Sequence, residues 1–178
     1  MKGLDILGCG LGFGAGPDFS LQRERWGVNS LMFMRYSGEF DNWTRWFDLH
    51  SSAHIQQHRP DAYAWYCTQT KPIYRWEPDP HMVTALYPRE AMQMHFAQDG
   101  VPERDFWGSL AWMLALAIYE GFEQIDLWWF PLDQERHHAQ LGSSRYWLGR
   151  ARQAGIRVLI HGDSSLKPSG PMYGIETT

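Results

Sequence analysis

Asp48 and His50 are the pair in this sequence best suited to acid–base chemistry. They close a short apolar segment, 45–50, that we expect to be a strand, and residues two apart on a strand point to the same side. A carboxylate beside an imidazole orients the ring, as a general base requires. We therefore predict that His50 is a general base supported by Asp48. The alternative is a buried hydrogen-bonded pair that only stabilises the fold.

A glycine-rich segment, 8–16, follows the first predicted strand. The letters of 10–15 match the dinucleotide fingerprint, but only about eight residues separate Pro17 from Trp26, too few for the crossover helix that this fingerprint opens. Glycines without side chains still let backbone N–H groups approach a phosphate or sugar. We predict such ligand contacts for Gly8, Gly10 and Gly12, with a closely packed turn as the equal alternative.

Two further polar residues fall at predicted element ends. Asn29 lies near the end of a predicted strand, 25–31, where its amide could both donate to and accept from a ribose or sugar; turn formation is the alternative. Ser109 is predicted to be the N-cap of a helix over 110–120 and could offer its hydroxyl and the helix N-terminal amides to a phosphate. Both are predicted ligand-binding residues.

The histidine spacing invites a metal interpretation. His50, His54 and His58 recur every fourth residue, and two histidines four apart on a helix can bind zinc. However, His50 is predicted to end a strand, and no Glu lies between His54 and His58. We expect a solvated helix face, and neither a metal nor a cofactor.

These residues must be positioned by the predicted elements. Apolar runs bounded by Gly and Pro predict strands at 4–7, 25–31, 45–50, 72–76, 84–87, 124–130 and 156–160. Helices are predicted over 52–70 with a break at Pro60, and over 89–97, 110–120 and 143–154. Helices that alternate with strands across short joins are typical of a parallel sheet. We predict a single Rossmann-like α/β domain over 1–178, with a mainly parallel central sheet flanked by helices.

Composition excludes several classes of protein. The 178 residues carry 16 Lys and Arg against 20 Asp and Glu, and 10 Trp. This aromatic-rich, slightly acidic chain is neither disordered nor suited to duplex nucleic acid. Two cysteines predict no disulfide framework, the start shows no signal segment, and the longest apolar run, 110–118, falls well short of the about 20 residues that span a membrane. We expect a cytoplasmic location without membrane association. The oligomeric state stays open, a homo-oligomer included.

Four blocks of the chain carry a family resemblance: 26–29, 46–50, 108–125 and 146–156. They contain Trp-Gly-Val-Asn, Trp-Phe-Asp-Leu-His, a Ser-Leu-Ala-Trp-Met-Leu-Ala-Leu-Ala helix and Tyr-Trp-Leu-Gly-Arg-Ala. With them the chain resembles a family of small uncharacterised phage proteins with a Rossmann-like fold. It is more distantly similar to sialyltransferase-like and motility-associated-factor proteins, which bind nucleotide-sugars or related diphosphates. The resemblance implies a nucleotide- or nucleotide-sugar-binding, transferase-like protein of the host cytoplasm, with its ligand over the C-terminal strand ends.

Two departures from these families affect the expected nucleotide site. The strand after the long apolar helix usually ends in Gly-Val-Asp-Met, whereas 129–133 is Trp-Phe-Pro-Leu-Asp, so the acid is displaced. The first turn of the relatives commonly has Pro-Ser, but Pro17 comes late and no Ser follows it. A non-catalytic phage accessory protein, which sequesters a small nucleotide-like ligand or engages a host protein, is therefore the alternative function.

Overall fold

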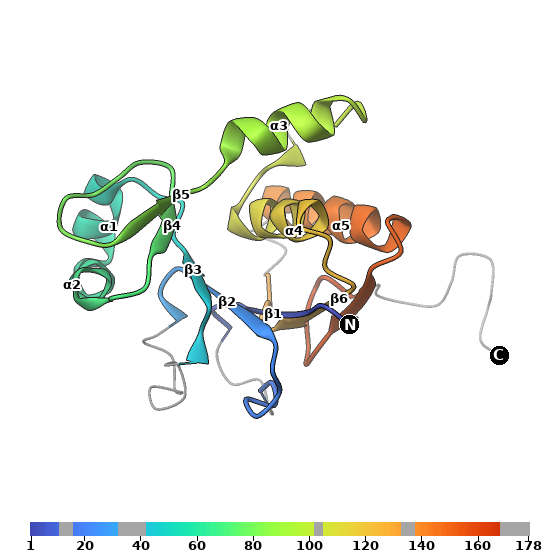
Figure 1. Cartoon of the computed structure of the whole chain (residues 1–178), viewed down its shortest axis with the longest axis horizontal. Helices are drawn as coiled ribbons and strands as arrows, with labels where there is room; N and C mark the ends of the chain where they lie inside the picture. The colour runs from blue at the N-terminus through green and yellow to red at the C-terminus, as the bar shows by residue number, and fades with distance from the viewer. Residues whose placement is uncertain (11–15, 32–41, 102–104, 133–137, 168–178) are drawn as a thin grey trace.

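A computed structural model describes residues 1–10, 16–31, 42–101, 105–132 and 138–167. These residues form one α/β domain around a seven-stranded sheet in the order β5-β4-β3-β2-β1-β6-β7, with every neighbouring pair parallel (Figure 1). The strands are β1 (Gly3–Leu7), β2 (Glu24–Val28), β3 (Arg45–Phe47), β4 (Ile73–Arg75), β5 (Thr84–Leu86), β6 (Gln124–Trp128) and β7 (Arg157–Ile160). The predicted parallel α/β fold is confirmed.

Five helices of the described residues flank the sheet. They are α1 (Ser52–His58), α2 (Pro60–Thr68), α3 (Arg89–Ala97), α4 (Ser109–Tyr119) and α5 (His138–Gln153). Figure 1 shows α4 and α5 side by side over one face, and α1 and α2 at the end of the sheet that β4 and β5 form. None of the helices in these ranges combines the length and the apolar character that crossing a bilayer demands.

The strand order reverses between β1 and β6. From β1 the chain passes outward through β2, β3, β4 and β5, and it then returns to the other side of β1 to form β6 and β7. The loops after β1 and β6 therefore leave the sheet in opposite directions. In open α/β sheets, the crevice beyond the carboxyl ends of the strands at such a point is where ligands bind.

The long apolar helix α4 lies in the main core, as its sequence predicted. All residues from Leu110 to Ala117 are buried, among side chains of β1, β2, β6 and α5. Gly121 ends the helix with a φ of 69°, and the N–H groups of Gly121 and Phe122 donate to the carbonyls of Ile118 and Ala117. Glycine adopts this left-handed conformation without a Cβ penalty, so the predicted helix stop is confirmed.

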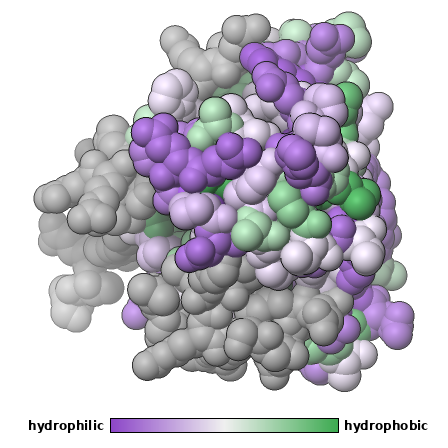
Figure 2. All heavy atoms as spheres, turned by 90° about the vertical axis from the view of Figure 1, so that its left-hand side faces the viewer, coloured by the Kyte–Doolittle hydropathy of each residue, from purple (hydrophilic) through white to green (hydrophobic). Residues whose placement is uncertain are grey.

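A second apolar cluster lies between the sheet and the helices α1 and α2. It contains Trp43, Trp46 and Tyr66. Gly27 of β2 makes room for it, since a Cβ there would lie 2.5 Å from the ring of Trp46. Figure 2 shows this end of the molecule from outside, where hydrophilic side chains predominate and the apolar areas between them are small.

Four predicted boundaries are wrong. Ser109 is not the N-cap of α4, because Gly108 with a φ of 97° precedes the helix and no side chain caps it. Helix α5 begins at residue 138 rather than 143 and buries Leu141, an isolated apolar residue in a polar stretch. Strand β2 ends earlier than predicted, since Asn29 takes a left-handed φ of 49°, and strand β3 ends at Phe47 rather than at residue 50. Asp48 and His50 thus lie in the loop after β3.

Candidate functional site

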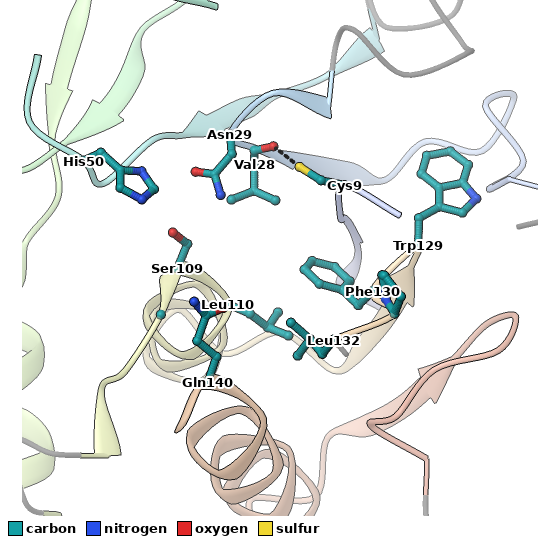
Figure 3. A pocket seen from close by; sticks show the side chains of 12 residues that line it. Cys9, Val28, Asn29, His50, Ser109, Leu110, Trp129, Phe130, Leu132 and Gln140 are labelled. Carbon is teal, nitrogen blue, oxygen red and sulfur yellow. Dashed lines mark hydrogen bonds between the residues drawn. The ribbon is translucent and has the colours of Figure 1, made fainter. Parts of the chain in front are cut away.

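A cavity of about 350 Å³ opens at the carboxyl ends of β1, β2, β3 and β6, next to the point where the strand order reverses. Its walls come from six separate stretches of the chain (Figure 3). The lining residues are Cys9, Val28, Asn29, His50, Gly108, Ser109, Leu110, Trp129, Phe130, Pro131, Leu132 and Gln140.

The cavity has a polar end and an apolar end. Figure 3 shows the polar tips of His50, Asn29, Ser109 and Gln140 gathered at one end, whereas Phe130 and Leu132 lie toward the other. Such a division suits a ligand that carries hydrogen-bonding groups on one part and an apolar or planar ring on another. Three of the predicted site residues, Asn29, His50 and Ser109, therefore lie together as expected from their positions at element ends.

Strained backbone concentrates at this cavity. Within the described residues, the non-glycine residues with positive φ are Asn29 at 49°, Trp129 at 60° and Leu132 at 36°. All three line the cavity. Left-handed conformations are costly for side chains of this size, and they cluster where a site requires a particular geometry.

Asn29 lines the cavity, and its side chain carries a hydrogen-bond acceptor that the protein itself leaves unused. Its backbone N–H donates to the carbonyl of Phe47 at 2.9 Å, and its carbonyl accepts from Trp46 Nε1 at 3.0 Å and from the Tyr66 hydroxyl at 2.8 Å. Its side-chain Oδ1 is buried and has no hydrogen-bond partner in the described part of the chain. A buried amide oxygen without a partner costs free energy, and a ligand donor would recover it once the side chain turns Oδ1 toward the cavity.

Asp48 and His50 form the predicted pair, with the carboxylate behind the imidazole. Asp48 is fully buried, and its Oδ1 lies 2.8 Å from His50 Nδ1. The His50 side chain is 40% exposed and lines the cavity. With Nδ1 next to the carboxylate, Nε2 is the ring nitrogen available to a ligand.

Arg59 and Tyr66 complete the surroundings of Asp48. The guanidinium of Arg59 donates to both carboxylate oxygens, at 2.9 and 3.2 Å, and the Tyr66 hydroxyl lies 2.7 Å from Oδ2. Burial raises the pKa of Asp48, but the hydrogen bond from His50, the charge of Arg59 and the Tyr66 hydroxyl outweigh it, so the pKa falls below its ordinary value. Asp48 is therefore ionised at neutral pH.

The sequence analysis missed Arg59 and Tyr66. Arg59 immediately precedes the helix break at Pro60, and Tyr66 lies on the buried side of α2. Neither position has a spacing relation to Asp48 that signals the contact. Only the packing of α1 and α2 against β3 brings them to the carboxylate.

Gly8 and Gly10 hold the loop after β6. Their N–H groups donate to the carbonyls of Trp128 and Trp129, both at 2.8 Å, which prolongs the pairing of β1 with β6. A Cβ on Gly8 would lie 2.5 Å from the carbonyl oxygen of Trp129 and 2.8 Å from the Phe130 ring. Neither glycine lines the cavity, so their contact with a ligand stays a prediction. Gly12 lies outside the described residues.

Ser109 begins α4 at the polar end of the cavity. Ser109 and Leu110 occupy the first two helical positions, whose N–H groups have no carbonyl partner one turn earlier. The helix dipole adds partial positive charge there, which favours an anionic ligand group. The φ of 97° at Gly108, together with a Cβ that would lie 3.1 Å from Gln140 Cγ, requires glycine before the helix.

Cys9 contributes a neutral wall to the cavity. Its thiol donates to the carbonyl of Val28 at 3.1 Å, and burial raises its pKa to about 12. The thiol therefore stays protonated at neutral pH.

The predicted histidine face is present on α1. The His54 ring stacks on His50 with centroids 4.9 Å apart, and the His58 ring lies 4.5 Å from that of His54. Within the described residues, no group of three or more histidine, cysteine or carboxylate side chains is arranged to hold a metal ion.

The fold is similar to that of the sialyltransferase CstII from Campylobacter jejuni. Its complex with the substrate analogue cytidine-5'-monophosphate matches with a TM-score of 0.58 and 14% identity, over 93% of this chain and 82% of the other. Its complex with CMP-3FNeuAc matches with a TM-score of 0.55 and 13% identity, over 91% and 81%. No protein-family model and no curated protein sequence matches this chain. The protein therefore has a distant sialyltransferase-like fold.

Proposed function

We propose that this protein binds a nucleotide or nucleotide-sugar in the cavity at the C-terminal strand ends and transfers the sugar to an acceptor hydroxyl. The observation that carries the proposal is the polar end of the cavity, where Asn29, His50 and the start of α4 at Ser109 converge. The likeness in fold to a transferase solved with CMP and a CMP-sugar supports it.

Each polar group has a role in this proposal. The first-turn N–H groups of α4 and the Ser109 hydroxyl bind the phosphate, because a helix N-terminus attracts an anion. The Asn29 Oδ1 accepts from a ribose or sugar hydroxyl. The apolar end, with Phe130 and Leu132, receives the planar base.

His50 acts as the general base of the transfer. The acceptor hydroxyl attacks the anomeric carbon, while Nε2 of His50 takes the hydroxyl proton. The bond between the anomeric carbon and the phosphate oxygen breaks, and its electron pair leaves with the nucleotide. Asp48, at 2.8 Å from Nδ1, stabilises the imidazolium that forms.

Calorimetric titration with CMP and with CMP-, UDP- and GDP-linked sugars tests the binding step. We expect at least one of them to bind at micromolar to millimolar concentration, and Ser109→Ala to weaken that binding about tenfold, as loss of a hydrogen bond to a charged group does. Ser20→Ala is the matched control, since Ser20 lies in an exposed turn where its hydroxyl donates to Asp18, and it does not line the cavity. No binding of any of these compounds at millimolar concentration would refute the proposal.

The non-catalytic alternative also has an observation in its favour. No carboxylate is among the described lining residues, and apart from His50 the titratable side chain there is the neutral thiol of Cys9. A protein of this kind, such as the phage accessory protein that the sequence resemblance suggests, would sequester the nucleotide without turnover. His50→Ala separates the two functions: a transferase loses product formation but keeps nucleotide affinity within about threefold, whereas a sequestering protein shows no product in either form.

A further inference from the structure

The Tyr66 hydroxyl lies between the two polar walls of the cavity. It is 2.7 Å from Asp48 Oδ2, which supports His50, and 2.8 Å from the carbonyl oxygen of Asn29. Tyr66 is fully buried. The hydroxyl has one proton and both neighbours are acceptors, so it shares this proton between them. One buried hydroxyl thus contacts the backbone of Asn29 and the carboxylate that supports His50.

His50 Nδ1 has two competing neighbours. It lies 2.8 Å from Asp48 Oδ1 and 3.0 Å from Arg59 Nη2. Arginine only donates and an ionised carboxylate only accepts. A protonated Nδ1 therefore bonds to Asp48, and an unprotonated Nδ1 bonds to Arg59.

The outcome of this competition decides what His50 presents to the cavity. In the neutral ring one nitrogen carries the proton and the other does not. If Nδ1–H bonds to Asp48, Nε2 offers a lone pair; if Nδ1 accepts from Arg59, Nε2 is a donor. Both bonds have one charged partner, so the shorter one, to the carboxylate at 2.8 Å, prevails when Asp48 is held in place.

We propose that Tyr66 is a positioning residue: it fixes Asp48 so that the carboxylate keeps the Nδ1 proton of His50, and it holds the left-handed turn at Asn29 in register with that histidine. The effect on ligand affinity rests on the proposed function, whereas the effect on the His50 tautomer does not.

The surroundings of Tyr66 fit this role. Its ring packs in the second apolar cluster with Trp46 and Ile55, so the hydroxyl is held by rigid neighbours. Without the hydroxyl, Asp48 Oδ2 keeps only Arg59, whose side chain is 21% exposed. The carboxylate can then shift away from His50, and Arg59 Nη2, which already lies 3.0 Å from His50 Nδ1, becomes the favoured partner of that nitrogen.

Tyr66→Phe tests the proposal, with Tyr63→Phe as the matched control. Tyr63 lies on the same helix and its hydroxyl also donates to a buried carboxylate, that of Asp79, at 3.1 Å. Nitrogen-15 NMR of labelled histidines, with the His50 signal assigned through His50→Gln, gives the tautomer directly. Calorimetry with CMP gives the affinity.

We expect the wild type to carry the proton on Nδ1 of His50. Tyr66→Phe should raise the Nε2–H population at least about threefold and weaken CMP binding about tenfold, in line with the loss of one buried hydrogen bond to a charged group. Tyr63→Phe should change neither. An unchanged tautomer in Tyr66→Phe, or an equal shift in Tyr63→Phe, would overturn the proposal.

Arg59→Gln gives a second test that does not depend on Tyr66. It removes the competing cation, so we expect His50 of the Arg59→Gln variant to keep the Nδ1–H form. When Arg59→Gln is added to Tyr66→Phe, we expect the Nδ1–H form that Tyr66→Phe lost to be restored. Loss of the Nδ1–H form in Arg59→Gln would contradict the competition. If the tautomer responds as expected but the wild type binds no CMP, the positioning role stands and the nucleotide function fails.

Discussion

The carboxylate behind His50 holds several elements together, and Asp48→Asn measures how strongly. Asp48 is fully buried and accepts hydrogen bonds from His50, Arg59 and Tyr66. The amide of the variant would point a donor at one of these donors and leave the Arg59 cation without its counter-ion. Breaking a buried ion pair costs about 3–5 kcal/mol. The Arg59 side chain is 21% exposed and thus partly hydrated, so we expect a loss of about 3 kcal/mol, or a fall in Tm of roughly 6–12 °C.

Urea unfolding followed by tryptophan fluorescence at pH 7 measures this loss. Asp79→Asn is the control, because Asp79 is also buried, with 7% of its surface exposed, but it bonds to the hydroxyls of Ser52 and Tyr63 and has no ion pair among the described residues. We expect it to cost about 1 kcal/mol. A loss below about 0.5 kcal/mol for Asp48→Asn would refute the reasoning, since an exposed or unpaired carboxylate behaves in that way.

The difference in free energy of unfolding between wild type and Asp48→Asn should depend on pH, because the pKa of Asp48 is lowered in the folded protein. A carboxyl whose folded pKa lies below its unfolded value, about 3.9 for Asp, contributes stability above that value and loses it as the pH falls through the folded pKa. The gap between wild type and Asp48→Asn should therefore stay constant from about pH 8 to 5 and shrink below about pH 4. A gap that grows on acidification would contradict the assigned direction.

Three further variants test other parts of the structure. Gly27→Ala would place a Cβ 2.5 Å from the Trp46 ring, whereas the Cβ of Gly142→Ala meets nothing within 4 Å. Urea unfolding should show a free energy of unfolding about 2 kcal/mol lower for Gly27→Ala and about 0.5 kcal/mol higher for Gly142→Ala. The reverse order would contradict the packing. With a pKa of about 12, about one Cys9 side chain in ten thousand is a thiolate at pH 8. Iodoacetamide should therefore modify this residue slowly in the native protein, which peptide mapping measures. Modification as fast as in urea would refute the burial of Cys9. Because Asn29 has a φ of 49°, the free energy of unfolding of Asn29→Gly should lie within about 0.5 kcal/mol of the wild-type value, and that of Asn29→Ala about 1 kcal/mol below it. Both variants should bind CMP about tenfold more weakly by calorimetry. An alanine variant more stable than the glycine variant would exclude a strained turn.

Much of the fold could be predicted because its signals are local. The apolar runs of β1, β6 and β7 and the glycine stop at Gly121 each depend on a few neighbouring residues. The cap of α4 could not be predicted in this way. Ser109 is a common cap residue, but Gly108 takes a φ of 97° against Gln140 of a distant helix, and that contact exists only in the folded chain.

The candidate site also contains residues that the sequence could predict and residues that it could not. Asn29, His50 and Ser109 were predictable because parallel strands and the helices between them bring their ends to one edge of the sheet. Arg59 and Tyr66 were not, since their contacts with Asp48 arise from the packing of α1 and α2. The glycine-rich composition of the first turn did not predict its contacts, because the N–H groups of Gly8 and Gly10 donate to the carbonyls of Trp128 and Trp129.

A crystal structure of the protein grown with CMP tests the central claim most directly. We predict electron density for the nucleotide in the cavity, with its phosphate at the start of α4 beside Ser109 and a hydroxyl within hydrogen-bond distance of Asn29 Oδ1. Nucleotide density at another place on the protein, or an unchanged cavity at millimolar CMP, would contradict the account.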